Sequence, residues 1–514
     1  MFKSVLTVSF YTLISRILGF IRDIFIASYL GSTFIADAFF VAFRIPNYFR
    51  RVFAEGAFSA AFIPVFSGLV NKPKNNKEAQ VFVEQTMSLI FIIIILISII
   101  FHFLMPYVII ILAPGFIDNI ETYNLAVDFG KIIFPYLLFI SLVAQFSSIT
   151  NTYNRFALGA FSPALLNISF ICSLLFFTPY VTTAGHAMSY GVLIGGLAQF
   201  ILMYYAIYKL QIKPFLVFPK IDNNIRKFFK LFVPGVLGAG AIQLNIITGT
   251  IIASFLPTGA ISHLYYAARI NQLPLAIFGI ALGVALLPTL SNYIKNDVSA
   301  DKINNLQNRS IEFSLLISFP CVIGLYILSE PIISILFERG AFTSIDTYYS
   351  SKVLSVFVLG LPAYILIKVF NPSFFAREDT KTPFYVTIVC VGLNIIISLL
   401  LISKYREIGI AIATSISAWI NVLILYFILS KRGHLILDKK LRINFYKIII
   451  SSTIMGIATL IFYNLFFDQT LLNNSLINVI MLLLAIIFSI IIFASLVFML
   501  KIYTLEELKK QFIK

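Results

Sequence analysis

Charged residues are scarce in this sequence. Only 12% of its 514 residues are Asp, Glu, Lys or Arg, whereas 60% are hydrophobic, and the mean hydropathy is +0.95. Soluble globular domains carry about 25% charged residues, so the composition excludes a soluble protein. The chain is therefore expected to be an all-α polytopic membrane protein.

Cysteine and histidine are also scarce, which bears on enzymatic chemistry. The cysteines lie in separate apolar segments without a second Cys or His at metal-ligand spacing, and the histidines are scattered without a carboxylate constellation. These residues are Cys172, Cys321, Cys390, His102, His186, His263 and His434. A membrane-embedded transferase or phosphatase needs acid–base, nucleophilic or metal-binding groups near one face. We therefore predict that the protein is not an enzyme and binds no metal or other cofactor.

Apolar stretches of roughly 20 residues, the length that spans a bilayer, can be placed about fourteen times along the chain. The predicted spans are residues 5–30, 33–53, 84–112, 129–150, 158–179, 185–210, 228–255, 262–290, 312–336, 350–373, 383–403, 408–430, 444–467 and 475–500. The first contains Arg16, Arg22 and Asp23 and no small-residue cleavage site, so it is interpreted as a retained span and not as a signal peptide.

The net charge of +16 follows the predicted loops. With the N-terminus inside, the Lys and Arg clusters at 72–77, 209–230 and 431–442 fall in cytoplasmic loops, and the outer connectors carry few basic residues apart from Lys404 and Arg406. This distribution satisfies the positive-inside rule. Both termini are predicted to be cytoplasmic, and the basic loops give no indication of nucleic-acid binding.

Two parts of the chain resemble each other at an offset close to 225 residues. The matching segments are Phe40–Ile45 with Tyr265–Ile270, Ala61–Ser67 with Ala285–Ser291, and Pro106 and Gly115 with Pro331 and Gly340. Such internal repeats are typical of transporters in which two bundles rock around a central cavity. We predict pseudo-symmetric six-helix bundles at residues 1–220 and 221–440, followed by two additional transmembrane helices at 441–514.

Charged residues lie inside several predicted spans, where each costs about 2.5–3.5 kcal/mol at the helix centre. The basic ones are Arg16, Arg22, Arg44, Arg50, Arg51, Arg269 and Lys368, and the acidic ones are Asp23, Asp37 and Glu55. Because arginines outnumber carboxylates, a positive surplus remains for an anion, and a guanidinium donates to two phosphate oxygens at once. The alternative is that each arginine pairs with a neighbouring carboxylate or reaches a lipid headgroup.

The spacing of these charges sets geometric requirements. Ser15 lies seven residues before Arg22, and such pairs share one helix face. Arg16 and Arg22 lie on different faces, so both reach one ligand only if the helix bends at Gly19. Pro46 provides a second bend after Arg44. These positions are candidate gating hinges, although Gly19 would equally permit close helix packing.

The N-terminal run Ser15-Arg16-Ile17-Leu18-Gly19-Phe20-Ile21-Arg22-Asp23, with the segments 37–47 and 50–58, resembles the MurJ (MviN) lipid II flippases of the MOP exporter superfamily. Weaker agreement covers essentially the whole chain. The resemblance implies a flippase of the bacterial inner membrane that carries lipid II, an undecaprenyl-diphosphate-linked disaccharide pentapeptide, from the inner to the outer leaflet during cell-wall biogenesis.

The resemblance also implies roles for individual residues. Arg16, Arg22, Arg50 and Arg269 would hold the diphosphate, and Asp23 and Asp37 would pair with arginines and rearrange during the cycle. The last two helices would form a groove for the lipid tail. Gln272 stands where an acidic residue is expected, so a salt bridge with Arg269 is in doubt.

Several alternatives stay open. The energy source is either the membrane potential or a cation gradient, such as one of Na⁺, because the carboxylates of a sodium site are not evident. A flippase for another polyprenyl-diphosphate-linked oligosaccharide of the O-antigen type is separated only by the N-terminal motif. A MATE-like multidrug exporter would have an acidic cavity and lack the last two helices. Partners are membrane lipids and, as a further expectation, the cell-wall synthesis machinery.

Overall fold

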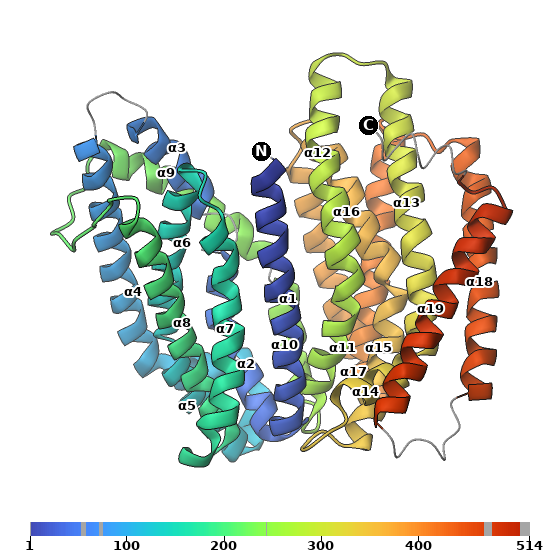
Figure 1. Ribbon diagram of the computed structural model, residues 1–514, viewed down its shortest axis with the longest axis horizontal. Helices are drawn as coiled ribbons and strands as arrows, with labels where there is room; N and C mark the ends of the chain where they lie inside the picture. Colours follow the sequence, from blue (N-terminus) through green and yellow to red (C-terminus); the bar gives the residue numbers. More distant parts are fainter. Residues whose placement is uncertain (1, 53–57, 71–75, 243, 467–474, 504–514) are drawn as a thin grey trace. The chain divides into compact units, whose positions relative to one another are not determined.

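The computed structural model describes residues 2–52, 58–70, 76–242, 244–466 and 475–503, and within these ranges it contains helices and no strands. Figure 1 labels these helices along the chain. The prediction of an all-α class is confirmed. Chain contacts divide the protein into two compact units, Met1–Ser262 with Arg339–Phe342, and His263–Glu338 with Thr343–Lys514.

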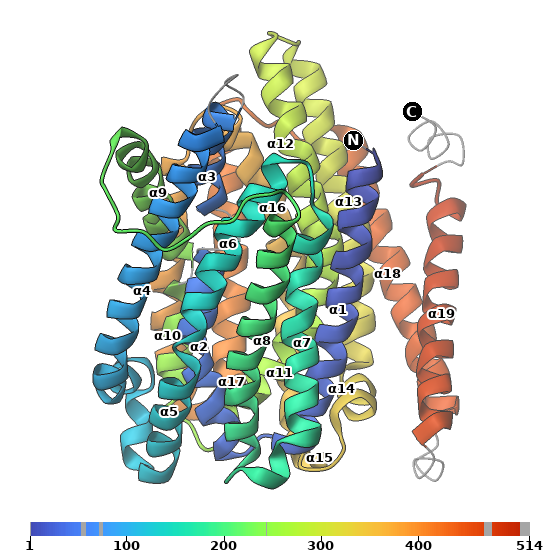
Figure 2. The ribbon, with the colours of Figure 1, turned by 60° about the vertical axis from the view of Figure 1, so that its left-hand side comes forward.

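The first unit contains ten α-helices among its described residues. They are α1 (Phe2–Leu30), α2 (Phe34–Val52), α3 (Phe58–Val70), α4 (Asn76–Leu112), α5 (Ile120–Ile133), α6 (Tyr136–Thr152), α7 (Ala157–Phe176), α8 (Ala184–Tyr208), α9 (Asn223–Ile242) and α10 (Leu244–Ala253), with short 3₁₀ turns at Pro114–Asp118 and Thr178–Tyr180. α7 packs against α1 and α8, while α6 packs against α3 and α8, and Figure 2 shows α1, α7 and α8 side by side.

Small residues let α7 and α8 approach closely. A Cβ on Gly191 would lie 2.2 Å from the Ser173 hydroxyl oxygen, and one on Gly195 would lie 2.8 Å from a Leu166 methyl carbon. Helix association in lipid relies on such close backbone approach, because lipid tails are as apolar as the side chains. The glycines of α8 therefore fix the position of α7, which carries part of the candidate site.

The second unit contains the remaining helices. They are α11 (Ala260–Pro274), whose first residues belong to the first unit, a π-helical turn (Leu275–Gly279), α12 (Ile280–Lys295), α13 (Ala300–Ile327), α14 (Ser329–Phe337), α15 (Ser344–Leu359), α16 (Leu361–Phe375), α17 (Lys381–Lys431), α18 (Lys439–Phe466) and α19 (Ser475–Met499). Arg406 has φ 48° and ψ −132° and interrupts α17. The predicted spans 383–403 and 408–430 are the two sides of this kink.

A polar network joins the start of α18 to α13. The Glu312 side chain is fully buried, accepts a hydrogen bond of 2.8 Å from Asn444 Nδ2, and forms an ion pair with Arg309. Arg309 also pairs with Asp438, whose Oδ1 accepts a bond of 2.6 Å from the Leu441 backbone N–H. Burial of a carboxylate is tolerated when it is paired and hydrogen-bonded, and here both partners are present.

Ten helical segments of the described chain are long and apolar enough to span a membrane, counting Lys381–Lys431 once. α1 and α2, which contain the charged residues of the first two predicted spans, are not among the ten. Each predicted span overlaps at least one helix of the described residues, but the exact number of spans stays a prediction. α3 was not predicted, because its 13 residues are fewer than the roughly 20 needed to cross a bilayer.

The compact units divide between Ser262 and His263, later in the chain than the predicted bundle boundary at 220/221. The reason is packing, because α9 lies against α3, α2 and α4 within the first unit. The aromatic side chains of Phe228 and Phe232 contact Phe58 there, with ring centroids 5.3 and 5.8 Å apart. The division into two six-helix bundles and two added helices stays a prediction.

Candidate functional site

The Arg22 side chain in α1 forms a short ion pair with its neighbour Asp23. Arg22 Nε and Nη2 lie 3.1 and 2.7 Å from Asp23 Oδ1, and the side chains are 12% and 4% exposed. The guanidinium carbon also lies 5.4 Å from the centre of the Phe170 ring. Arg22 is therefore paired with a neighbouring carboxylate, as in the alternative considered for intramembrane arginines.

Asn167 in α7 holds Arg22 in place. Arg22 Nη1 donates to Asn167 Oδ1 at 2.9 Å, and Asn167 Nδ2 donates to the Ser15 carbonyl oxygen at 2.9 Å. A Cβ on Gly19 would lie 3.4 Å from Asn167 Nδ2. Asn167 was not among the residues predicted from the sequence, although a lone amide within the apolar helix Ala157–Phe176 is a signal of a polar contact inside the membrane.

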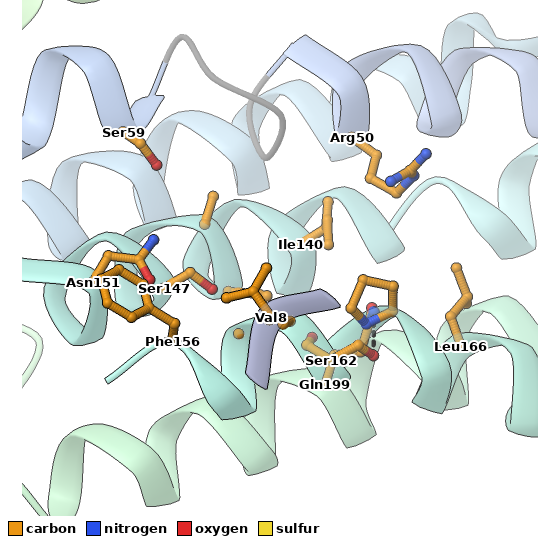
Figure 3. Close-up of a pocket in the computed structure, with 15 residues that line it drawn as sticks. Val8, Arg50, Ser59, Ile140, Ser147, Asn151, Phe156, Ser162, Leu166 and Gln199 are labelled. Atoms are coloured by element: carbon orange, nitrogen blue, oxygen red, sulfur yellow. Dashed lines mark hydrogen bonds between the residues drawn. The ribbon is translucent and has the colours of Figure 1, made fainter. Parts of the chain in front are cut away.

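Arg50 lines a cavity within the first unit. The cavity has a volume of about 370 Å³ and is bounded by residues of α1, α2, α3, α6, α7 and α8. Figure 3 shows Arg50 and Ser59 on one side and the side chains of Ser147, Asn151 and Gln199 across from them. Arg50 Nε donates to Asn47 Oδ1 at 3.0 Å.

The remaining predicted residues of α1 and α2 differ in exposure. Arg16 is exposed, Arg44 is half-buried and Pro46 is buried. α1 runs without interruption through Gly19, and α2 runs through Pro46. Gly19 faces Asn167, so its position fits close packing of α1 on α7, while the two hinges stay predictions.

Asp37 is 4% exposed and caps the start of α11. Its Oδ2 accepts a bond of 2.6 Å from the Gly259 N–H, and its Oδ1 accepts bonds of 2.9 and 2.6 Å from the Ser262 N–H and hydroxyl. A carboxylate at a helix N-terminus is stabilised by these otherwise unpaired N–H groups and by the helix dipole. Pairing of Asp37 with an arginine stays a prediction, and Glu55 lies outside the described residues.

Arg269 belongs to the second unit. It is half-buried on α11, where its Nη2 donates to the Tyr265 hydroxyl at 2.8 Å and its guanidinium carbon lies 4.6 Å from the centre of the same ring. Gln272 and Lys368 are exposed. Three of the predicted diphosphate ligands, Arg16, Arg22 and Arg50, are therefore in the first unit and one is in the second.

One expectation from the sequence is wrong, because His263 does contact carboxylates. Its Nδ1 lies 3.1 Å from Glu407 Oε1, and its Nε2 lies 3.3 Å from Asp346 Oδ1. These partners are 144 and 83 residues away in the chain. Neither contact has a signal in the sequence, because both depend on how α11, α15 and α17 pack.

Comparisons with known proteins agree with one another. The family model described as "Lipid II flippase MurJ" matches residues 26–481. A probable lipid II flippase MurJ of Rhizobium tropici is 39% identical over 460 residues, which cover 88% of this chain and 85% of that protein. One of Rickettsia prowazekii (strain Madrid E) is 39% identical over 462 residues, covering 89% of each.

Solved structures give the same result. A lipid II flippase MurJ in an inward closed conformation aligns with a TM-score of 0.79 and 31% sequence identity, covering 99% of this chain and 100% of that one. An inward-facing multidrug resistance MATE family transporter of the MOP superfamily aligns with a TM-score of 0.64 over 84% of this chain and 99% of its own. At 12% identity, the MATE likeness shows the fold alone.

Proposed function

Because this chain belongs to the lipid II flippase MurJ family, we propose that it moves lipid II from the inner to the outer leaflet of the bacterial inner membrane. The cargo is a polyprenyl diphosphate that bears a sugar–peptide headgroup, and transport proceeds by alternating access. The observation that carries the proposal is the Arg22–Asp23–Asn167 arrangement, in which a guanidinium is held inside the membrane by groups that an anion can replace.

The proposed mechanism begins with Arg22 in its resting pair. Asp23 Oδ1 accepts from both Nε and Nη2, the two donors that a phosphate oxygen pair would use. When the diphosphate arrives, it takes over these donors, while Asn167 keeps its contact with Nη1. The carboxylate is then released to rearrange, so binding of cargo and movement of α1 are linked through a single exchange of anions.

Arg50 supplies a second charge beside a polar cavity. The 370 Å³ volume is within the range of about 300–1,000 Å³ that ligand sites occupy, and hydroxyl and amide side chains line it. Such groups can hydrogen-bond sugar or phosphate oxygens. We assign this cavity to part of the headgroup, and we assign Arg16 and Arg269 to contacts made as the cycle proceeds.

We also propose the membrane topology and the energy source that are expected from the sequence. Both termini face the cytoplasm, and the membrane potential or a cation gradient, including one of Na⁺, supplies energy. The protein acts as a transporter without catalysis or a cofactor. Its partners are lipid II, the surrounding lipids and the cell-wall synthesis machinery, and α18 and α19 accommodate the lipid tail.

Depletion of the protein tests the choice of cargo. We expect undecaprenyl-diphosphate-linked disaccharide pentapeptide to accumulate in the inner leaflet, measured by mass spectrometry of extracted lipids together with a leaflet-accessibility assay. Restoring expression of the wild type should clear it, as should Lys431→Ala, which changes an exposed residue. Accumulation of a surface-polysaccharide precursor instead would overturn the proposal.

A further inference from the structure

His263, at the start of α11, contacts the start of α15 and the kink of α17 within the second unit. It lies in the first turn of α11 and is 5% exposed. Asp346 lies in the first turn of α15, and Glu407 directly follows the kink at Arg406 in α17. The His263 and Tyr349 rings are stacked, with centroids 5.4 Å apart. The imidazole is therefore held on both edges and on one face.

The contacts of the imidazole define its proton content. Each ring nitrogen faces a carboxylate oxygen, at 3.1 Å for Glu407 and 3.3 Å for Asp346. An ionised carboxylate only accepts hydrogen bonds, and a neutral histidine has one nitrogen that also only accepts. A neutral His263 would thus direct a lone pair at a buried carboxylate, whereas the imidazolium donates to both.

The same geometry excludes a shared metal ion. Asp346 and Glu407 lie against opposite nitrogens of one ring, so their oxygens do not converge on a point that the imidazole also reaches. Within the part of the chain that the structure describes, no group of three His, Cys, Asp or Glu side chains is arranged to hold a metal. The ligand that fits between these groups is a proton.

The surrounding charges make the proton important to the fold. Asp346 Oδ2 accepts bonds of 2.7 and 2.9 Å from the Thr343 N–H and hydroxyl, which fixes that carboxylate at the start of α15. Glu338 accepts a bond of 2.8 Å from the Thr347 hydroxyl nearby, and Arg406 adjoins Glu407. Without the proton, the buried Glu407 carboxylate and the half-buried Asp346 carboxylate would flank a neutral ring, and breaking a buried pair in this way is strongly destabilising.

We propose that His263 is a proton-binding site whose bound proton holds together the starts of α11 and α15 and the kink of α17, and whose release separates them during the transport cycle. The role of proton release in transport rests on the function proposed above. The site is separate from the Arg22–Asp23–Asn167 arrangement, which belongs to the first unit. A proton would thereby act on the second unit directly, without displacing the diphosphate ligands described for the first.

Hydrogen–deuterium exchange of the full-length protein in nanodiscs tests the site itself. After correction for intrinsic exchange, protection of the first turns of α11 and α15 should be lower at an alkaline pH, at which His263 has lost its proton, than at about pH 6. We expect a decrease of at least about tenfold, because one pKa unit corresponds to a factor of ten in an equilibrium constant. His263→Gln should exchange rapidly at every pH. His263→Lys, which keeps a cation at alkaline pH, should stay protected throughout.

His434→Gln is the matched control, because His434 lies in the loop after α17 beside Arg377 and Arg432. Burial and these two cations lower the pKa of His434, which favours its neutral form, and this variant should keep the wild-type exchange profile. A wild type without any pH-dependent loss of protection would overturn the proposal, as would a His263→Gln or His263→Lys variant with the wild-type profile.

Flipping of lipid II in proteoliposomes separates this inference from the proposed function. The wild-type rate should change with pH, and the rate of His263→Lys should not. Arg22→Ala should lose flipping at all pH values, because it removes a cargo contact. If wild type and His263→Lys show the same pH profile, the proton site is refuted while the flippase function stands. If wild type moves no lipid II, the proposed function fails while the exchange measurement still decides the proton site.

Discussion

Arg22 donates a hydrogen bond of 2.9 Å to Asn167 Oδ1, and this contact joins the charged helix α1 to the apolar helix α7. Asn167 Nδ2 donates to the Ser15 carbonyl oxygen, about two turns before Arg22 along α1. Asn167 therefore fixes the orientation of the guanidinium in the membrane. Asp23 then completes a site that is neutral at rest and that an anion can enter by exchange.

The first prediction concerns Arg22 and its counter-charge. Arg22→Ala removes charge-assisted bonds worth about 1.5–3 kcal/mol each, so lipid II flipping should fall about 10- to 100-fold or more. It also removes the counter-charge of the buried Asp23, which lowers stability. The double variant Arg22→Ala/Asp23→Asn should recover the thermal stability but not the flipping rate, both measured on purified protein. Recovery of both would show that Arg22 serves only the fold.

Asn167→Asp is a nearly isosteric change that separates positioning from packing. The new carboxylate still accepts from Arg22 but no longer donates to the Ser15 carbonyl, and it adds a negative charge beside the proposed diphosphate position. We expect flipping to fall more than for Asn167→Ser, which adds no charge. The check is the flipping rate of each variant at equal membrane abundance. Equal rates for the two variants would contradict a nearby anion.

Gly19→Ala distinguishes a hinge from a packing contact. The added methyl would lie 3.4 Å from Asn167 Nδ2, an ordinary contact distance, and alanine favours a helix interior by about 0.5–1 kcal/mol over glycine. The thermal stability of Gly19→Ala should therefore be equal to or higher than that of the wild type. If the helix bends at Gly19 during the cycle, the flipping rate falls despite this gain, whereas an unchanged rate assigns Gly19 to packing.

Asp379 provides a prediction about pH. Burial raises the pKa of this carboxyl, but hydrogen bonds from Thr382 and Arg432 outweigh the effect and lower the pKa to about 2. A lowered pKa means that the stabilising contribution is present above the unfolded value of about 3.9 and is lost as the pH falls toward the folded value.

The comparison is wild type against Asp379→Asn in thermal unfolding. Because Arg432 is 42% exposed, we expect a small difference of at most about 1 kcal/mol. The difference should be constant above about pH 5 and disappear below about pH 2, where both chains are uncharged at this position. A difference that grows with acidity would contradict the assignment.

The helical class and the family resemblance were predictable because they depend on local information. The run from Ser15 to Asp23 carries the motif, and apolar length predicts where most helices lie. Asn167 and the partners of His263 were not predictable, because their contacts bridge 145, 83 and 144 residues and arise only when helices pack. The start of α11 was equally hidden, since Asp37 caps it from 225 residues away.

The network around Glu312 bears on how such a chain could change in length over evolution. Its amide partner Asn444 and the aspartate that shares its arginine, Asp438, both lie at the start of the final helical pair. A shortened descendant without α18 and α19 would keep the buried Glu312 carboxylate on α13 but lose its hydrogen bond from Asn444. Loss of α18 and α19 would thus require a compensating substitution at Glu312, which makes these two helices inseparable parts of the second unit.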